Sequence, residues 1–290
     1  DWPFNDAVLR KAADAMLAVP ATADYQDYAT AHVTEIIDRY RPDVLWNDVA
    51  WPPGGDLAAL FAHYYNTVPD GVINDRWIQP SGRRNVITDS LTRAAGDLIQ
   101  LLWKHIPEKD KQLTFPGAHW YDFRTPEYAV FDTVQDKKWE ATRGVGHSFG
   151  ANRNERPQDI VTATELVHML VDVVSKNGNL LIGIGPDAQG RIVPEQQAPL
   201  RGLGEWMAAH GDVMRGSRPW TAPATETTEG TPVRFVRKGD EVFAILLGLP
   251  GMRTFGLRGV DGIDEITLPE RVPVEPAYVV PLGTGARWSG

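Results

Sequence analysis

The chain has 290 residues, of which 42% are hydrophobic and 23% charged, and a formal net charge of −9 at pH 7. These proportions are ordinary for a globular protein, and the length suits one large domain and one small one. The negative charge argues against a nucleic-acid partner, because phosphates require a basic face. The lack of cysteine excludes disulfides, thiol nucleophiles and thiolate metal sites. No apolar run approaches the roughly 20 residues of a membrane span, so we expect no membrane partner.

The first residues, Asp1-Trp2-Pro3-Phe4, include neither an initiator methionine nor the basic and apolar regions of a signal peptide. We therefore expect no signal peptide within these 290 residues. Either a segment has been removed upstream or the sequence starts at an interior position, and the compartment stays open.

Short strands alternate with helices over nearly the first three quarters of the chain. Hydrophobic periodicity, capping signals and proline positions predict the elements. Helices are predicted over 25–40, 57–65, 90–106, 166–176 and 194–207. Strands are predicted between them, over 44–46, 72–77, 139–145 and 180–184. The continuous apolar run at 180–184 is typical of a strand covered on both faces. This alternation favours parallel βαβ units, hence a barrel or a doubly wound sheet.

The composition changes near Gly216, beyond which proline, glycine and threonine separate short β-rich runs. The runs lie at 233–236, 242–247, 265–268 and 277–280. They predict a small antiparallel β-sandwich. We therefore expect a first domain over 1–216 and a second over 217–290.

Several kinds of site are excluded by local sequence. The glycine-rich segment 183–190 resembles a dinucleotide loop, but Pro186 and the polar turn leave no room for the helix that such a loop requires. The seven histidines include no pair at i, i+4 spacing, so we expect no metal centre. The sequence contains no G-x-S-x-G nucleophile motif. We expect no cofactor.

Asp48 is the first candidate catalytic residue. It follows the short strand at 44–46 and lies between Trp46 and Trp51. A carboxylate at the end of a strand, beside flat aromatic surfaces, suits attack on an anomeric carbon and packing against a sugar ring. Aspartate also commonly caps the following loop or helix, and the residues alone do not separate the two interpretations.

A glycosidase needs a second carboxylate, and two glutamates are candidates. Glu127 lies in the aromatic, loop-like segment 122–128, a setting that suits a general acid. Glu140 lies on the strand predicted over 139–145, near Arg143, where a structural ion pair is equally consistent. Spacing alone leaves both open.

Five segments, taken in order, resemble the retaining α-L-fucosidases of glycoside hydrolase family 29: residues 42–48, 72–77, 122–128, 139–150 and 172–181. The resemblance runs through nearly all of residues 1–216, and the β-rich tail is similar to the family's C-terminal sandwich. It implies an α/β fold, a partial (β/α)8-type barrel followed by a small antiparallel β-sandwich.

The resemblance also implies the chemistry. Asp48 would be the nucleophile, and Glu127 rather than Glu140 the acid/base. Trp46, Arg76 and Phe149 would line the fucose site, with Arg76 near the nucleophile. The substrate would be a fucosylated glycan or glycoside, cleaved with retention. Retaining geometry predicts a separation of about 5–5.5 Å between the two carboxyl groups.

The chain departs from the family pattern in two places. It carries a long insertion between Arg76 and Glu127, which includes the helix predicted over 90–106. Family members also have a segment ahead of the position matching Asp1, which supplies the first barrel strands and contacts to the fucose hydroxyls. A whole barrel takes about 250 residues, so we expect roughly half of one here. Because open sheet edges tend to pair, we predict a homo-oligomer that covers or completes the barrel.

Two other functions remain as alternatives. One is a carbohydrate-binding remnant of a fucosidase with impaired catalysis, and the other is a retaining glycosidase for a different sugar. The presence of both candidate carboxylates together with their aromatic and arginine neighbours favours the enzyme.

Overall fold

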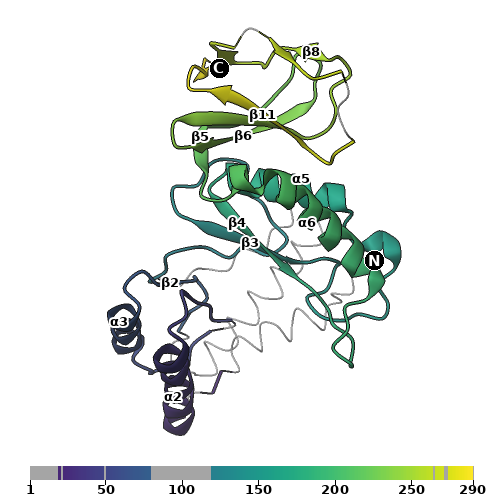
Figure 1. The fold of residues 1–290 in the computed structure, drawn as a ribbon. Helices are drawn as coiled ribbons and strands as arrows, with labels where there is room; N and C mark the ends of the chain where they lie inside the picture. The colour runs from purple at the N-terminus through teal and green to yellow at the C-terminus, as the bar shows by residue number, and fades with distance from the viewer. Residues whose placement is uncertain are drawn as a thin grey trace, which may run out of the picture. The chain divides into compact units, whose positions relative to one another are not determined.

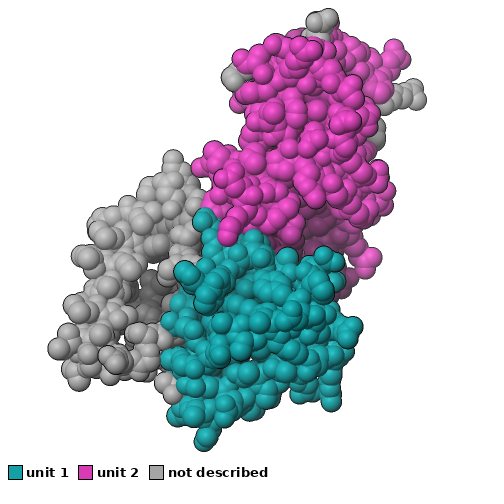
Figure 2. All heavy atoms as spheres, turned by 90° about the vertical axis from the view of Figure 1, so that its left-hand side faces the viewer, with its two compact units in different colours: residues 1–125 teal, residues 126–290 magenta. Residues whose placement is uncertain are grey.

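The computed structural model describes residues 19–20, 22–48, 50–79, 119–263, 265–270 and 274–289. The chain divides into two compact units, residues 1–125 and 126–290 (Figure 2). The domain boundary predicted at residue 216 is a different division of the chain and stays a prediction. The helix predicted over 90–106 lies outside the described residues.

The first unit contains a βαβ arrangement. Its elements are α2 (Ala23–Tyr40), β1 (Val44–Leu45), α3 (Leu57–Thr67) and β2 (Val72–Ile73). Strands β1 and β2 run parallel, which requires a crossover between them, and α3 supplies it. A parallel bridge between Asn74 and Phe123 adds a third extended segment beside β2. The Asp122 carboxylate fixes that segment by accepting the Ile73 N–H at 2.8 Å. The helices predicted over 25–40 and 57–65 and the strand predicted over 44–46 are confirmed, whereas the strand predicted over 72–77 is shorter and ends at Ile73.

The core of the first unit forms between α2, α3 and the two strands. Its buried members come from the apolar faces that the sequence predicts, together with two tryptophans of the following loops: Ile37, Leu45, Trp51, Leu57, Leu60, Phe61, Tyr64, Val68, Ile73 and Trp77. Tyr64 is fully buried, and its hydroxyl donates to the Pro42 carbonyl at 2.9 Å. Desolvation accordingly raises the pKa of Tyr64.

The second unit begins with another parallel pair. Strands β3 (Trp139–Gly144) and β4 (Gly178–Gly183) are joined through α5 (Ala163–Ser175). A capping box, one of the capping signals in the sequence, starts α5: Thr162 accepts the Glu165 N–H, and the Glu165 carboxylate accepts the Thr162 N–H. The last helix, α6 (Pro194–Met214), extends beyond its predicted end at residue 207. Leu181 of β4 is 43% exposed, so the expectation of a strand covered on both faces is wrong at that position.

A four-stranded antiparallel sheet follows, in the order β11-β7-β6-β5. The strands are β5 (Arg218–Glu226), β6 (Pro232–Lys238), β7 (Glu241–Leu246) and β11 (Tyr278–Gly283). The sequence did not predict β5, which contains Pro219 and Pro223. Proline cannot donate to a ladder, and β5 accommodates both because it is an edge strand with a register shift.

Both faces of this sheet are buried. Two short antiparallel pairs follow the sheet: β8 (Thr254–Phe255) pairs with β10 (Ile266–Thr267), and β9 (Val260–Asp261) pairs with β12 (Arg287–Trp288). Val242 and Ala244 of β7 lie in a core that these pairs share. Phe243 and Ile245 pack in a cluster with residues of α5 and α6. Figure 1 shows these two helices beside the sheet. The antiparallel β-region predicted from the sequence is confirmed, and helices and sheet share one core within this unit.

The described residues contain two separate parallel strand pairs, β1–β2 and β3–β4, and no closed ring of strands. The described helices also include none long and apolar enough to cross a membrane.

A charged cluster links α5 to the sheet. Asp172 of α5 accepts two hydrogen bonds from Lys176 Nζ, at 2.9 and 2.8 Å, and one from the Arg234 guanidinium of β6. The side chains of Lys176 and Asp172 are 7% and 17% exposed. Because one carboxylate serves two shielded cations, its loss leaves both without compensation.

We expect Asp172→Asn to lower the free energy of unfolding by about 3 kcal/mol, because removing one partner of a buried ion pair leaves the remaining charges uncompensated. Urea unfolding followed by tryptophan fluorescence measures the change. Glu226→Gln is the matched control, since the Arg258–Glu226 pair is more than half exposed and should contribute less than about 1 kcal/mol. Equal losses in the two variants would contradict this role for Asp172.

Candidate active site

Strand β1 ends at the residues that carry the first candidate carboxylate. The carboxamide of Asn74, fully buried at the end of β2, contacts the backbone of Asn47 twice. It accepts the Asn47 N–H at 3.0 Å and donates to the Asn47 carbonyl at 2.7 Å. The Asn47 side chain in turn donates to the carbonyls of Ala50 and Arg76. The loop that presents Asp48 is therefore anchored to β2 on its N-terminal side.

Arg76 brings three of the predicted site residues together. Its Nη1 donates to Asp48 Oδ1 at 3.0 Å. Its guanidinium carbon lies 4.8 Å from the centre of the Trp46 ring, within cation–π range. The Arg76 side chain is 7% exposed and that of Asp48 is 60% exposed. A shielded cation thus holds a carboxylate that remains accessible to a ligand.

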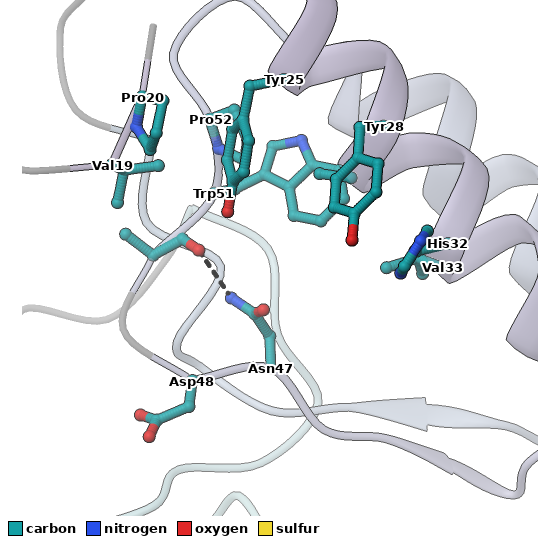
Figure 3. A pocket seen from close by; sticks show the side chains of 12 residues that line it. Val19, Pro20, Tyr25, Tyr28, His32, Val33, Asn47, Asp48, Trp51 and Pro52 are labelled. Carbon is teal, nitrogen blue, oxygen red and sulfur yellow. Dashed lines mark hydrogen bonds between the residues drawn. The ribbon is translucent and has the colours of Figure 1, made fainter.

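A cavity of about 440 Å³ opens beside Asp48. Figure 3 shows the rings of Tyr25 and Tyr28, from the first turns of α2, on one side of it and Asp48 on another. Asn47, Trp51 and His32 add further polar and aromatic groups to the lining. In the sequence, Tyr25, Tyr28 and His32 fit the apolar or semi-polar spacing of an amphipathic helix. That spacing alone does not indicate that they line a cavity.

Glu127 lies in the second unit on an extended segment beside β3. Its neighbours on both sides bond to Thr142: the Thr142 N–H donates to the Pro126 carbonyl and the Tyr128 N–H to the Thr142 carbonyl, each at 3.0 Å. The position of the Glu127 backbone is therefore set by a strand, although the segment is loop-like in sequence. Glu140 lies on β3 itself, paired with Asn179.

Tyr128 is held in an unusual conformation next to Glu127. Its φ of 49° lies in the left-handed region, which is costly for a residue other than glycine and is common at functional sites. The ring packs edge-on against Phe149 with centroids 5.3 Å apart, and its hydroxyl accepts the Gly144 N–H at 3.1 Å. Burial raises the pKa of Tyr128 and lowers that of Arg143, whose guanidinium lies over the Tyr128 ring.

Gly144 permits this packing. A Cβ at Gly144 would lie 2.1 Å from the Ser148 carbonyl oxygen and 3.1 Å from the Tyr128 hydroxyl. Only glycine allows the backbone of residues 144–148 to come this close. Phe149 follows directly and is 44% exposed, so its ring is accessible.

The predicted residues thus fall into two groups. Trp46, Asp48 and Arg76 meet in the first unit, and Glu127 and Phe149 flank Tyr128 in the second. Asn74 and Tyr128 were not identified from the sequence, because Asn74 lies inside the strand predicted over 72–77 and Tyr128 lies in the loop-like segment 122–128. Over the ranges that the structure describes, no three acidic or histidine side chains gather as a metal site would require.

Comparison with known proteins assigns the family. The family model described as α-L-fucosidase matches residues 1–212. The chain belongs to the α-L-fucosidase family. A solved structure of the Thermotoga maritima α-fucosidase is 35% identical, with a TM-score of 0.68, and the match covers 90% of this chain and 57% of that one. A further structure, the T. maritima α-fucosidase in complex with fucose, is 36% identical, has a TM-score of 0.66 and is matched over 87% of this chain and 54% of that one.

Curated relatives are more distant in sequence. The α-L-fucosidase of Branchiostoma floridae is 27% identical over 249 residues, covering 81% of this chain and 47% of the relative. The tissue α-L-fucosidase of Bos taurus is 28% identical over 223 residues, covering 74% of this chain and 40% of the relative. The chain spans about half the length of the fucosidases that it matches.

Proposed function

We propose that this chain carries the catalytic residues of a retaining exo-α-L-fucosidase, a glycosidase that removes α-L-fucose from fucosylated glycans or glycosides. The observation that carries the proposal is the contact of Arg76 with Asp48 and Trp46 at the end of two parallel strands. The family membership and the likeness to a fucosidase structure with bound fucose support it. We also propose that residues 1–216 form a partial (β/α)8-type barrel, followed by a β-sandwich.

In the proposed mechanism, Asp48 is the nucleophile. A lone pair of its carboxylate forms a bond to the anomeric carbon while the glycosidic C–O bond breaks and its electron pair moves to the departing oxygen. Glu127 gives its proton to that oxygen. Glu127 then takes a proton from water, which attacks the fucosyl–Asp48 ester and releases fucose with its original configuration.

The other proposed residues bind and orient. Arg76 orients the Asp48 carboxylate through the hydrogen bond from Nη1. Trp46 and Phe149 offer accessible aromatic surface to the apolar face and methyl group of the sugar. This division of roles requires no cofactor.

Turnover of an aryl α-L-fucoside, compared with an aryl β-galactoside, tests the proposal. We expect release of the aryl group from the fucoside alone, and proton NMR of the first product should show α-L-fucose. Preference for the galactoside would favour a glycosidase of different sugar specificity. No turnover of either substrate, together with fucose binding in calorimetry, would favour a carbohydrate-binding protein.

The homo-oligomer expected from the sequence remains a prediction. Sedimentation velocity at micromolar concentration measures it, and a stable monomer would contradict it.

A further inference from the structure

Arg76 Nη1 donates to Asp48. The other two nitrogen atoms of the guanidinium meet Thr125: Nε donates to Thr125 Oγ1 at 2.8 Å, and Nη2 donates to the Thr125 carbonyl at 3.0 Å. Arg76 and Thr125 are 6% and 3% exposed. Because the guanidinium is a rigid planar fork, two bonds on one edge fix the direction of the remaining nitrogen. The Thr125 contacts therefore determine where Nη1 points.

Asp75 orients the Thr125 hydroxyl. A hydroxyl has one proton to donate, and its oxygen can accept from Arg76 only while that proton points elsewhere. The Thr125 hydroxyl donates to Asp75 Oδ1 at 2.7 Å, and the same oxygen accepts the Thr125 N–H at 3.1 Å. Asp75 is thus bonded to both the side chain and the backbone of Thr125, which keeps the hydroxyl oxygen available to Nε.

We propose that Thr125 and Asp75 are positioning residues that aim Arg76 at the nucleophile, in a chain of contacts from Asp75 through Thr125 and Arg76 to Asp48. The inference rests on the proposed function. Arg76 Nη1 donates to Oδ1 of Asp48 at 3.0 Å and so restricts the orientation of the carboxylate. Bond formation at the anomeric carbon depends on that orientation, and a displacement of about 1 Å can cost roughly 10²-fold in rate.

The contacts predict different outcomes for two substitutions at one position. Thr125→Val keeps the shape of the side chain but removes the hydroxyl, so Arg76 Nε loses its acceptor inside the protein. Thr125→Ser keeps the hydroxyl and loses a methyl group. Thr227→Val is the matched control, because Thr227 is fully buried and its hydroxyl accepts the Thr231 N–H at 3.0 Å in the other unit.

The first measurement is the rate of covalent labelling by a 2-deoxy-2-fluoro-fucosyl fluoride, followed by intact mass spectrometry. We expect the maximal labelling rate of Thr125→Val to fall about 30-fold, with the reagent's half-saturating concentration changed less than about 3-fold. Thr125→Ser and Thr227→Val should label within about 3-fold of the wild-type rate. Asp75→Ala should fall between Thr125→Val and the wild type. Wild-type labelling by Thr125→Val would overturn the inference.

The second measurement does not depend on activity. NMR of arginine Nε–H groups labelled with ¹⁵N reports solvent exchange at Arg76. We expect Thr125→Val to accelerate this exchange at least about 10-fold and Thr125→Ser to leave it slow, since only the hydroxyl oxygen protects the proton. If the wild-type protein takes no label, the proposed function fails. In that case the solvent exchange of the Arg76 Nε–H still tests the positioning role of Thr125. An exchange rate in Thr125→Val equal to that of the wild type overturns the inference.

Discussion

Asp48→Gly is expected to lower the hydrolysis of aryl α-L-fucosides by at least roughly 10⁴-fold, the scale of loss when a covalent nucleophile is removed. The variant leaves a space beside Arg76 and Trp46 where the carboxylate lay, and a small anion fits there. Added azide should therefore restore release of the aryl group. Because azide attacks once, from the side of the missing carboxylate, the product should be β-L-fucosyl azide, identified by proton NMR.

Asp70→Gly is the matched control. It removes an exposed aspartate of the same unit, in the turn before β2, and should leave turnover unchanged. Circular dichroism should show both variants folded. A folded Asp48→Gly protein that is inactive and is not rescued by azide would place the nucleophile at another residue.

Glu127→Ala is expected to separate substrates by their leaving groups. A poor leaving group such as an alkyl alcohol needs the proton that Glu127 supplies, so its cleavage should slow by roughly 10²–10⁴-fold. An activated aryl group departs without a proton, so its first release should slow by less than about 10-fold. The fucosyl–Asp48 ester should then accumulate, visible by mass spectrometry, because no base activates water.

Azide distinguishes the two roles by stereochemistry. In Glu127→Ala it attacks the fucosyl–Asp48 ester, so two inversions give α-L-fucosyl azide, the opposite anomer to that from Asp48→Gly. Glu140→Ala serves as the comparison, since Glu140 is the competing glutamate and lies on β3 opposite Asn179. If Glu140→Ala gives α-L-fucosyl azide and Glu127→Ala does not, the assignment of the acid/base is wrong.

The element pattern was predictable because it depends on local signals. Apolar spacing defined α2, the box of Thr162 and Glu165 started α5, and Pro42 ended a helix. Strand β5 was missed because its prolines argue against a strand, and only pairing at a sheet edge makes them acceptable. The end of α6 was missed because its last turn is stabilised by packing of Val213 and Met214 against the β-sheet, which no local signal encodes.

The sequence by itself determined the family and the candidate carboxylates, since motif order and residue type survive without coordinates. Only the tertiary structure decided which residues anchor the loop of Asp48 and orient Arg76. Asn74 meets Asn47 across 27 positions, and Arg76 meets Thr125 across 49. The chain brings these residues together because parallel strands carry their ends to one edge of a sheet. Such contacts are set by strand register, a long-range property that the periodicity of a single segment does not contain.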